Sequence, residues 1–197
     1  MQNKEYFKNY IKAFLEQNSK LNLISKNDEK FLWEKHIFDS LSIEKFFEKY
    51  QFDGKNLLDF GTGGGFPAVP IALAYPKIDV TAMDSIRKKI NAITAIKEEL
   101  KISNLTPLCG RVETLDEKFD LITSRAVANL GKIVEYAMPR LKKDGYFIAY
   151  KSVKVKEEIE EAKPILKKLK AEIVDIIQYD LPLQENHTRN LVVIKHK

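Results

Sequence analysis

The pattern of apolar positions changes near residue 56 of the chain. Before that point, apolar residues recur at spacings of three, four and seven, which is typical of amphipathic helices. We expect one helix near the N-terminus, a connector at 21–25, and a second helical stretch over 27–50. The residues expected on the two buried faces are Tyr6, Phe7, Tyr10, Ile11, Phe14 and Leu15, then Phe31, Leu32, Ile37, Leu41, Phe46 and Phe47.

Beyond residue 56, short apolar runs alternate with helical patterns. The runs predict strands at 56–60, 79–84, 105–109, 119–124, 145–151, 172–181 and 190–195, and the patterns between them predict helices near 67–75, 86–101, 130–142 and 154–170. This alternation indicates an α/β fold with a mostly parallel sheet covered on both faces. The last two strands have no helix between them, so we expect an antiparallel C-terminal hairpin. The prediction is a Rossmann-like, seven-stranded domain over 51–197 with an N-terminal helical extension over 1–50.

The amino-acid composition indicates the class of protein and its cellular location. Hydrophobic residues make up 44% and charged residues 31%, as in ordinary globular proteins. No apolar run approaches the roughly 20 residues that span a bilayer, and no apolar signal region follows the N-terminal charges. We therefore expect a cytoplasmic protein without a membrane partner. One cysteine and three scattered histidines predict neither an internal disulfide nor a metal site.

The net charge of +5 and the pI near 9.0 favour anionic partners only weakly, because the excess is spread along the chain. A nucleic-acid surface would have to be assembled from groups such as 87–89 and 142–143. Each of these basic groups, taken alone, is more typical of a solvated helix face.

A glycine-rich segment, 59–67, follows the first predicted strand and opens a helix, an order that lets backbone N–H groups face a ligand. A dinucleotide fingerprint starting at Gly61 would need glycine where Phe66 stands, and no lysine follows as a phosphate-binding loop requires. The remaining acidic-x-Gly-x-Gly-x-Gly pattern resembles the first motif of S-adenosylmethionine (SAM) methyltransferases. Asp59 would help to hold the cationic tail of SAM, with Gly61 and Gly63 in the turn. A glycine turn without a ligand is the alternative.

Three further strand ends should meet this loop, because ligands of open α/β sheets lie beyond the carboxyl ends of the strands. Asp84, about 20 residues after the loop, is placed to bind the ribose hydroxyls. Its alternative is to cap the next helix, which Ser85 would do equally well. Val112 and Glu113 would frame the adenine ring and its amino group. Arg125, at the reaction end, would hold a nucleobase, a phosphate or the cofactor carboxylate, or form an ordinary surface ion pair.

These motifs, in this order, resemble those of the RsmG (GidB) family of bacterial 16S rRNA guanine-N7 methyltransferases. The matching stretches are Asn22-Leu23, 36–41, 61–67, Asp84-Ser85 with Lys88-Lys89, 111–113 and 124–128. The resemblance covers about 20–152, and it implies SAM contacts for Gly61, Phe66, Val112, Glu113 and Arg125. Departures from the family pattern are mild: Ser25 follows Ile24 where the family connector usually differs, Asp84 stands where Glu is common, and Lys151-Ser152 replaces a usual Lys-Gly.

Residues that other methyl acceptors require are missing from the motifs. Methylation of an exocyclic amine usually uses an Asn/Asp-Pro-Pro-aromatic loop, but 124–126 reads Ser-Arg-Ala. Methylation of cytosine C5 needs a cysteine beside the base, whereas Cys109 has no Pro-Cys motif and is typical of a small core residue. Guanine N7 has a lone pair and no proton to lose, so we expect catalysis by positioning, without a general base. His36 and Asp39 are expected to make a structural hydrogen bond or to cap the cofactor site.

The leading hypothesis is a SAM-dependent enzyme that methylates guanine N7 in 16S rRNA and acts as a monomer. Its N-terminal helices and basic loops would grip rRNA or the small ribosomal subunit, and Phe66 and Tyr150 are candidates for stacking on the target base. The alternative is a small-molecule methyltransferase that uses the N-terminal helices as a substrate lid. A third hypothesis is a non-catalytic RNA-binding protein with a SAM pocket.

Overall fold

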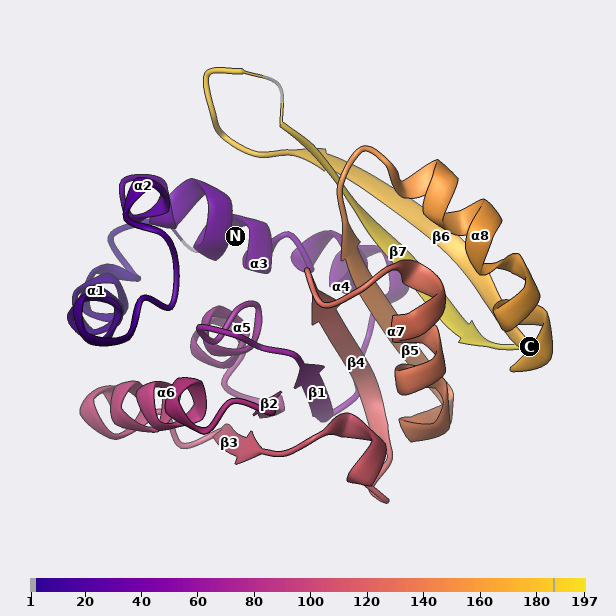
Figure 1. The fold of residues 1–197 in the computed structure, drawn as a ribbon, viewed down its shortest axis with the longest axis horizontal. Helices are drawn as coiled ribbons and strands as arrows, with labels where there is room; N and C mark the ends of the chain where they lie inside the picture. The colour runs from indigo at the N-terminus through magenta and orange to yellow at the C-terminus, as the bar shows by residue number, and fades with distance from the viewer. Residues whose placement is uncertain (1–2, 186) are drawn as a thin grey trace.

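The computed structural model describes residues 3–185 and 187–197. Within these residues, a seven-stranded sheet in the order β3-β2-β1-β4-β5-β7-β6 forms the centre of the molecule (Figure 1). The strands from β3 to β5 run parallel, and β7 lies antiparallel to both β5 and β6. The strands are β1 Asn56–Phe60, β2 Asp79–Asp84, β3 Leu105–Cys109, β4 Phe119–Arg125, β5 Leu141–Lys151, β6 Ala171–Asp180 and β7 Thr188–His196. The predicted sheet and its C-terminal hairpin are confirmed.

Helices cover both faces of this sheet because successive strand residues point to opposite sides. Leu57 belongs to one apolar core and Leu58 to the other. Figure 1 shows α1, α5 and α6 on one side and α7 and α8 on the other. The helices are α1 Lys8–Leu21, α2 Lys26–Glu29, α3 Asp39–Leu41, α4 Glu44–Tyr50, α5 Ala68–Ala74, α6 Arg87–Leu100, α7 Leu130–Ala137 and α8 Val155–Lys168. None of the helices in the described part of the chain has the length and apolar character needed to span a bilayer.

The N-terminal helices share a core with the sheet. Phe7, immediately before α1, and Tyr10 and Phe14 on α1 are at most 1% exposed. The ring of Phe14 lies 5.0 Å from the ring of Phe66, which follows the glycine loop. Truncating such a fully buried aromatic side chain typically costs about 3–5 kcal/mol of stability. Packing of the extension therefore supports the segment that carries the candidate site.

The second stretch, predicted as helical over 27–50, is largely helical but is divided into several segments. The structure has α2, then a π-helical segment Trp33–Phe38, then the separate helices α3 and α4. A π-helical turn accommodates about one extra residue, which rotates the apolar face by roughly 100° along the helix. Ile37 and Leu41 are buried as predicted, whereas Phe31, in the turn between α2 and the π-helical segment, is 36% exposed.

The boundary between α7 and β5 also differs from the prediction. The helix expected over 130–142 ends at Ala137, a 3₁₀ turn covers Met138–Arg140, and β5 begins at Leu141. Pro139 lacks the N–H that a continuing α-helix would need. The pairing of β4 with β5 then shifts, because Phe119 pairs with Leu141 and Leu121 pairs with Tyr146. The segment 142–145 therefore forms a bulge in β5. Regular pairing of β5 with β4 starts at Tyr146, close to residue 145, where the strand was expected to begin.

Candidate cofactor and substrate site

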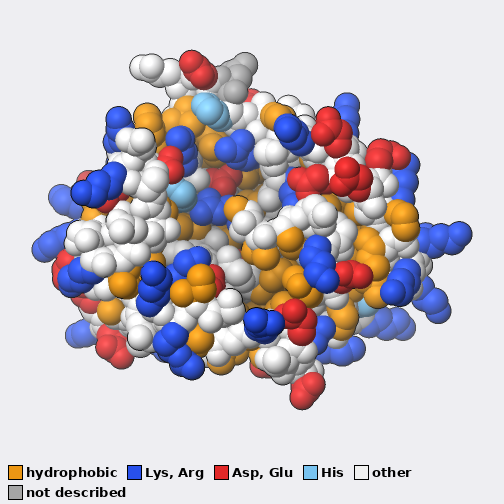
Figure 2. Space-filling model, in the orientation of Figure 1, with side chains coloured by type: hydrophobic (Ala, Val, Ile, Leu, Met, Phe, Trp, Pro, Cys, Tyr) orange, Lys and Arg blue, Asp and Glu red, His pale blue; other side chains and the backbone are white. Residues whose placement is uncertain are grey.

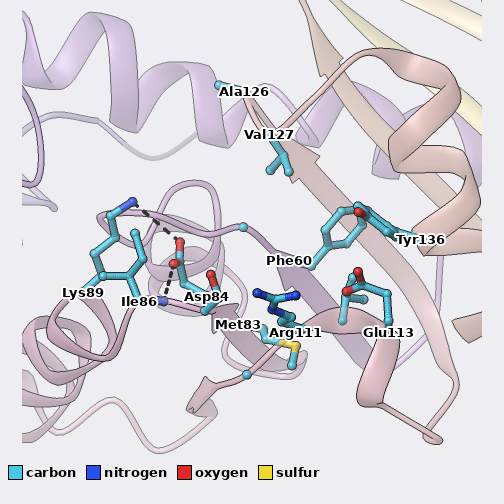
Figure 3. Close-up of a pocket in the computed structure, with 14 residues that line it drawn as sticks. Phe60, Met83, Asp84, Ile86, Lys89, Arg111, Glu113, Ala126, Val127 and Tyr136 are labelled. Carbon is cyan, nitrogen blue, oxygen red and sulfur yellow. Dashed lines mark hydrogen bonds and ion pairs between the residues drawn. The ribbon is translucent and has the colours of Figure 1, made fainter.

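A cavity of about 420 Å³ lies at the carboxyl ends of β1, β2, β3 and β4 (Figure 3). Its volume lies within the range of typical small-molecule sites. The residues that line it are Phe60, Gly61, Met83, Asp84, Ser85, Ile86, Lys89, Gly110, Arg111, Val112, Glu113, Ala126, Val127 and Tyr136. Apolar side chains thus alternate with two carboxylates and two cations, a lining suited to a neutral ring and a sugar rather than to a bare anion.

The glycine loop forms one wall of this cavity. Gly61 has φ +69°, and a Cβ added there would lie 2.2 Å from Cγ2 of Val127. Gly63 has φ +59°, and its N–H donates to Oδ2 of Asp84 at 2.9 Å. The N–H of Thr62 donates to the carbonyl of Met83 at 3.0 Å. The loop is therefore tied to the end of β2 in a conformation that glycine adopts easily.

Asp84 occupies the position predicted for ribose binding and also serves the start of α6. Its Oδ1 accepts the N–H of Ile86 at 2.9 Å, and Nζ of Lys89 lies 3.9 Å from Oδ2. Figure 3 shows the carboxylate at the edge of the cavity between Ile86 and Lys89. Each carboxylate oxygen has two lone pairs, so these backbone bonds leave acceptor capacity for a ligand. The two functions considered for Asp84 are compatible, and Ser85 makes no cap to α6.

Val112 and Glu113 reach the cavity from a 3₁₀ turn, Val112–Thr114, that follows β3. Sequence reasoning missed Tyr136 and Lys89, which approach from α7 and α6 respectively. Nothing in the periodicity of α7 distinguishes Tyr136 from a half-buried packing residue. Lys89 belongs to the basic group 87–89, and it is the member of that group that lines the cavity.

Asp59 and Phe66 do not line this cavity. Asp59 is fully buried on β1 and accepts the hydroxyl of Thr123 at 2.9 Å. Burial raises the pKa of its carboxyl to about 7. Phe66 is 3% exposed and packs against Phe14 and against His36, whose ring lies 5.0 Å away. Direct SAM contacts by Asp59 and Phe66 stay predictions, and the geometry favours support of the loop from behind.

Arg125 lines a second cavity of about 580 Å³, which shares Ala126 with the first. Its guanidinium donates to Oδ2 of Asp39 at 2.9 Å and to the carbonyl of Lys35 at 3.2 Å. The same group lies 5.3 Å above the ring of Phe66. The Arg125 side chain is 16% exposed. Arg125 is thus held by the N-terminal segment, in a partly buried ion pair rather than an ordinary surface one.

His36 is part of the same cluster. Nη2 of Arg125 lies 3.1 Å from Nδ1 of His36. Because arginine only donates, this contact makes Nδ1 the acceptor and leaves the ring proton on Nε2, which has no hydrogen-bond partner among the described residues. Burial, and then the charge of Arg125, lower the pKa of the imidazole to about 4. His36 and Asp39 are therefore joined through Arg125.

Tyr150 and Cys109, which were also considered from the sequence, contact neighbouring backbone groups. Tyr150 is buried at the edge of the second cavity, and its hydroxyl donates to the carbonyl of Ser40 at 2.8 Å. Cys109 is half-buried at the end of β3, with Sγ 3.9 Å from the carbonyl of Ser85. Across residues 3–185 and 187–197, no group of three or more His, Cys, Asp or Glu side chains is arranged to hold a metal ion.

Solved structures of methyltransferases share this fold. A SAM-dependent methyltransferase from Clostridium acetobutylicum superposes with a TM-score of 0.62 at 16% identity, covering 86% of this chain and 95% of that one. The M1A22 tRNA methyltransferase TrmK of Bacillus subtilis gives a TM-score of 0.61 at 15% identity, covering 83% and 66% of the two chains. At these identities the likeness concerns the fold alone.

Other proteins share a higher sequence identity with this chain than these solved structures do. A protein of Lachnoclostridium phytofermentans named ribosomal RNA small subunit methyltransferase G is 40% identical over 198 residues, covering 97% of this chain and 80% of the relative. A protein of the same name from Bacillus licheniformis is 35% identical, covering 97% and 81%. The GidB family model, described as rRNA small subunit methyltransferase G, matches residues 3–193. The chain belongs to the rRNA small subunit methyltransferase G family.

Proposed function

We propose that this protein transfers a methyl group from SAM to N7 of a guanine in 16S rRNA. The observation that carries the proposal is the pair of adjoining cavities that share Ala126. One has the lining of a nucleoside site, and the other is polar and bordered by the N-terminal segment. Membership of the family supports rRNA as the acceptor, and the expectations from the sequence motifs support SAM and N7.

The chain's own residues suit SAM in the first cavity. The missing Cβ of Gly61 leaves room beside Val127, and the Asp84 carboxylate retains acceptor capacity for ribose hydroxyls. Val112 would pack on the adenine ring, and the Glu113 carboxylate would accept from its amino group. SAM has no phosphate, so two carboxylates in the lining do not oppose its binding.

Bound SAM supplies an electrophilic methyl group on a positively charged sulfur. The lone pair of guanine N7 forms the new N–C bond as the S–C bond breaks, and the electron pair of that bond returns to sulfur. No proton leaves N7, so the protein needs no general base. Its contribution is to align the reacting atoms, which can supply roughly 7–11 kcal/mol. Neutral His36, beside Arg125, is consistent with a site that moves no proton.

Charge around the second cavity suits RNA. Lys35, Arg125, Lys151 and Arg189 line it, and Figure 2 shows Lys, Arg and His side chains around a hollow on this face. Three of these cations are paired with the lining carboxylates of Asp28, Asp39 and Glu158, which leaves Arg189 and the remaining donors of the pairs for phosphate. Cations grouped at a cleft attract phosphates and raise the association rate of a polyanion. The N-terminal segment contributes Lys35, His36 and Asp39 to this wall, so it would contact whichever acceptor binds.

The decisive experiment is to incubate the protein with methyl-labelled SAM and small ribosomal subunits from a strain that lacks the protein. We expect label on a single guanine of 16S rRNA and assign it to N7 by chain cleavage at the modified base. Label in a pool of small metabolites instead would support the small-molecule alternative. SAM binding without any transfer would support the non-catalytic one.

A matched pair of variants links this activity to the first cavity. Asp84→Asn removes a carboxylate acceptor, and we expect SAM affinity to fall about 10- to 100-fold. Asp79→Asn makes the same change at an exposed position at the start of β2, and it should leave affinity within twofold of wild type. Equal affinities for all three proteins would contradict the cofactor site.

A further inference from the structure

The second cavity contains a partly buried charge pair, Lys151 and Glu158, to which neither the family motifs nor the cofactor proposal gives a function. Lys151, the last residue of β5, has a side chain that is 8% exposed. Its Nζ donates to Oε2 of Glu158 at 2.6 Å and to the carbonyl of Ala128 at 2.8 Å. Glu158 lies in the first turn of α8 and also lines the cavity.

The bonds of this pair leave a defined set of groups available. Oε2 of Glu158 also accepts the N–H of Leu130 at 2.8 Å, so the hydrogen bonds of this carboxylate converge on one oxygen. A lysine ammonium has three donors, and Lys151 uses two of them within the protein. One N–H of Lys151 and Oε1 of Glu158 therefore remain as a neighbouring donor and acceptor.

That order of donor and acceptor is complementary to one edge of guanine. Guanine presents the O6 acceptor next to the N1–H donor, and N7 lies beside O6 on the adjoining edge. A base held through O6 and N1 therefore keeps N7 available for reaction. We propose that Lys151 and Glu158 select the target base, with Lys151 donating to O6 and Glu158 Oε1 accepting from N1–H. The inference rests on the proposed function and names the residues that make it specific for guanine.

The same pair discriminates against adenine. Adenine presents an amino donor where guanine has O6 and an acceptor at N1, so both contacts with the pair become repulsive. A good bidentate contact gives about 1–3 kcal/mol of discrimination, which corresponds to roughly 5- to 150-fold. Sites that pair buried polar groups with a substrate reject analogues that leave those groups unpaired.

The pair also places the selected base with respect to the cofactor cavity. Its bonds to the carbonyl of Ala128 and the N–H of Leu130 fix the segment that follows Ala126. Ala126 is the residue that both cavities share. Selection of the base and the position of the wall between base and methyl donor thus depend on the same two side chains.

The test uses small subunits reconstituted with 16S rRNA whose target guanosine is replaced by inosine, 2-aminopurine or adenosine. Inosine keeps O6 and N1–H, whereas 2-aminopurine keeps the amino group but lacks both. For the wild-type protein we expect kcat/KM on inosine within about tenfold of guanosine, and at least tenfold lower values on the other two. Methylation of 2-aminopurine subunits as fast as inosine subunits would overturn the inference, without reference to any variant.

Glu158→Gln is the second arm, because Gln can keep an oxygen toward Lys151 while its NH₂ replaces the free acceptor. We expect a loss of roughly 10- to 100-fold in kcat/KM on guanosine subunits and almost none on 2-aminopurine subunits. SAM affinity should not change, which also reports that the variant is folded. Glu157→Gln, at the exposed neighbouring position, is the matched control and should behave as wild type.

The possible failures can be told apart. An equal loss on both substrates in Glu158→Gln would show that the pair only braces the segment after Ala126, and the inference would be wrong. If the wild-type protein transfers no methyl group to guanosine subunits, the proposed function itself is refuted. Label on the guanine with no preference among the bases would refute only the assignment of Lys151 and Glu158.

Discussion

The guanidinium of Arg125 donates to the carboxylate of Asp39 at 2.9 Å, and this contact joins the end of β4 to α3. The other carboxylate oxygen of Asp39 accepts the hydroxyl of Tyr179 at 2.7 Å. Asp39 is 4% exposed. One carboxylate therefore connects the N-terminal segment, the central sheet and the C-terminal hairpin beside the candidate substrate cavity.

Removal of this carboxylate should destabilise the protein strongly. In Asp39→Ala the partly buried guanidinium loses its partner, and such losses typically cost about 3–5 kcal/mol. Chemical denaturation followed by circular dichroism measures the change in the free energy of unfolding. Glu16→Ala breaks the exposed ion pair between Glu16 and Lys20 and should change little. A smaller effect for Asp39→Ala than for this control would contradict the connecting role.

Asp59 should make the stability of the protein fall as the pH rises. Burial raises the pKa of the carboxyl from 3.8 to about 7 in the native state. Between these values the native state holds a proton that the unfolded state has lost, so the free energy of unfolding falls by up to about 1.4 kcal/mol per pH unit. Asp59→Asn removes this contribution. Urea denaturation at several pH values should show that the free energy of unfolding of the variant rises relative to that of wild type between about pH 4 and 7. A difference that stays constant with pH would contradict the buried protonated carboxyl.

His36 should make the free energy of unfolding rise with pH, opposite to Asp59, over an overlapping pH range. Its pKa falls from 6.5 to about 4 on folding, so below pH 6.5 the unfolded state takes up a proton that the native state does not. The contribution of His36 is fully present above pH 6.5 and is lost as the pH falls toward 4. His36→Asn keeps an acceptor for Arg125 and removes this dependence. Relative to wild type, the variant should gain stability as the pH is lowered, and a relative loss would show that the imidazole is charged in the native state.

Gly61 should be the most sensitive glycine of the loop for cofactor binding. An added Cβ would lie 2.2 Å from Cγ2 of Val127, so Gly61→Ala must displace the wall of the first cavity. Gly63→Ala shares the positive φ but meets no heavy atom within 4 Å of its Cβ. We expect SAM affinity, measured by calorimetry, to fall at least tenfold more in Gly61→Ala than in Gly63→Ala. Similar losses in both would indicate that backbone strain, and not the contact with Val127, governs the effect.

Much of the fold was predictable because its signals are local. The ranges predicted for β1, β2 and β3 agree with the structure, since each is a short apolar run bounded by turn residues. Parallel strands bring their carboxyl ends to one edge, and this placed Asp84, Val112 and Glu113 around one cavity. Phe31 was predicted to be buried but is 36% exposed, because it lies in a turn between α2 and the π-helical segment and not on a regular helix.

Local sequence patterns were enough to predict the α/β class, the succession of strands and helices along the chain and the glycine loop, because periodicity and turn chemistry act over a few residues. Which cavity each side chain lines depends instead on how the elements pack in three dimensions. Arg125 donates to Asp39, and Asp59 is fully buried behind the glycine loop. Lys151 donates to Glu158 beside the second cavity. These outcomes depend on burial and on partners that come from separate elements, and no local pattern records the free energy of such contacts.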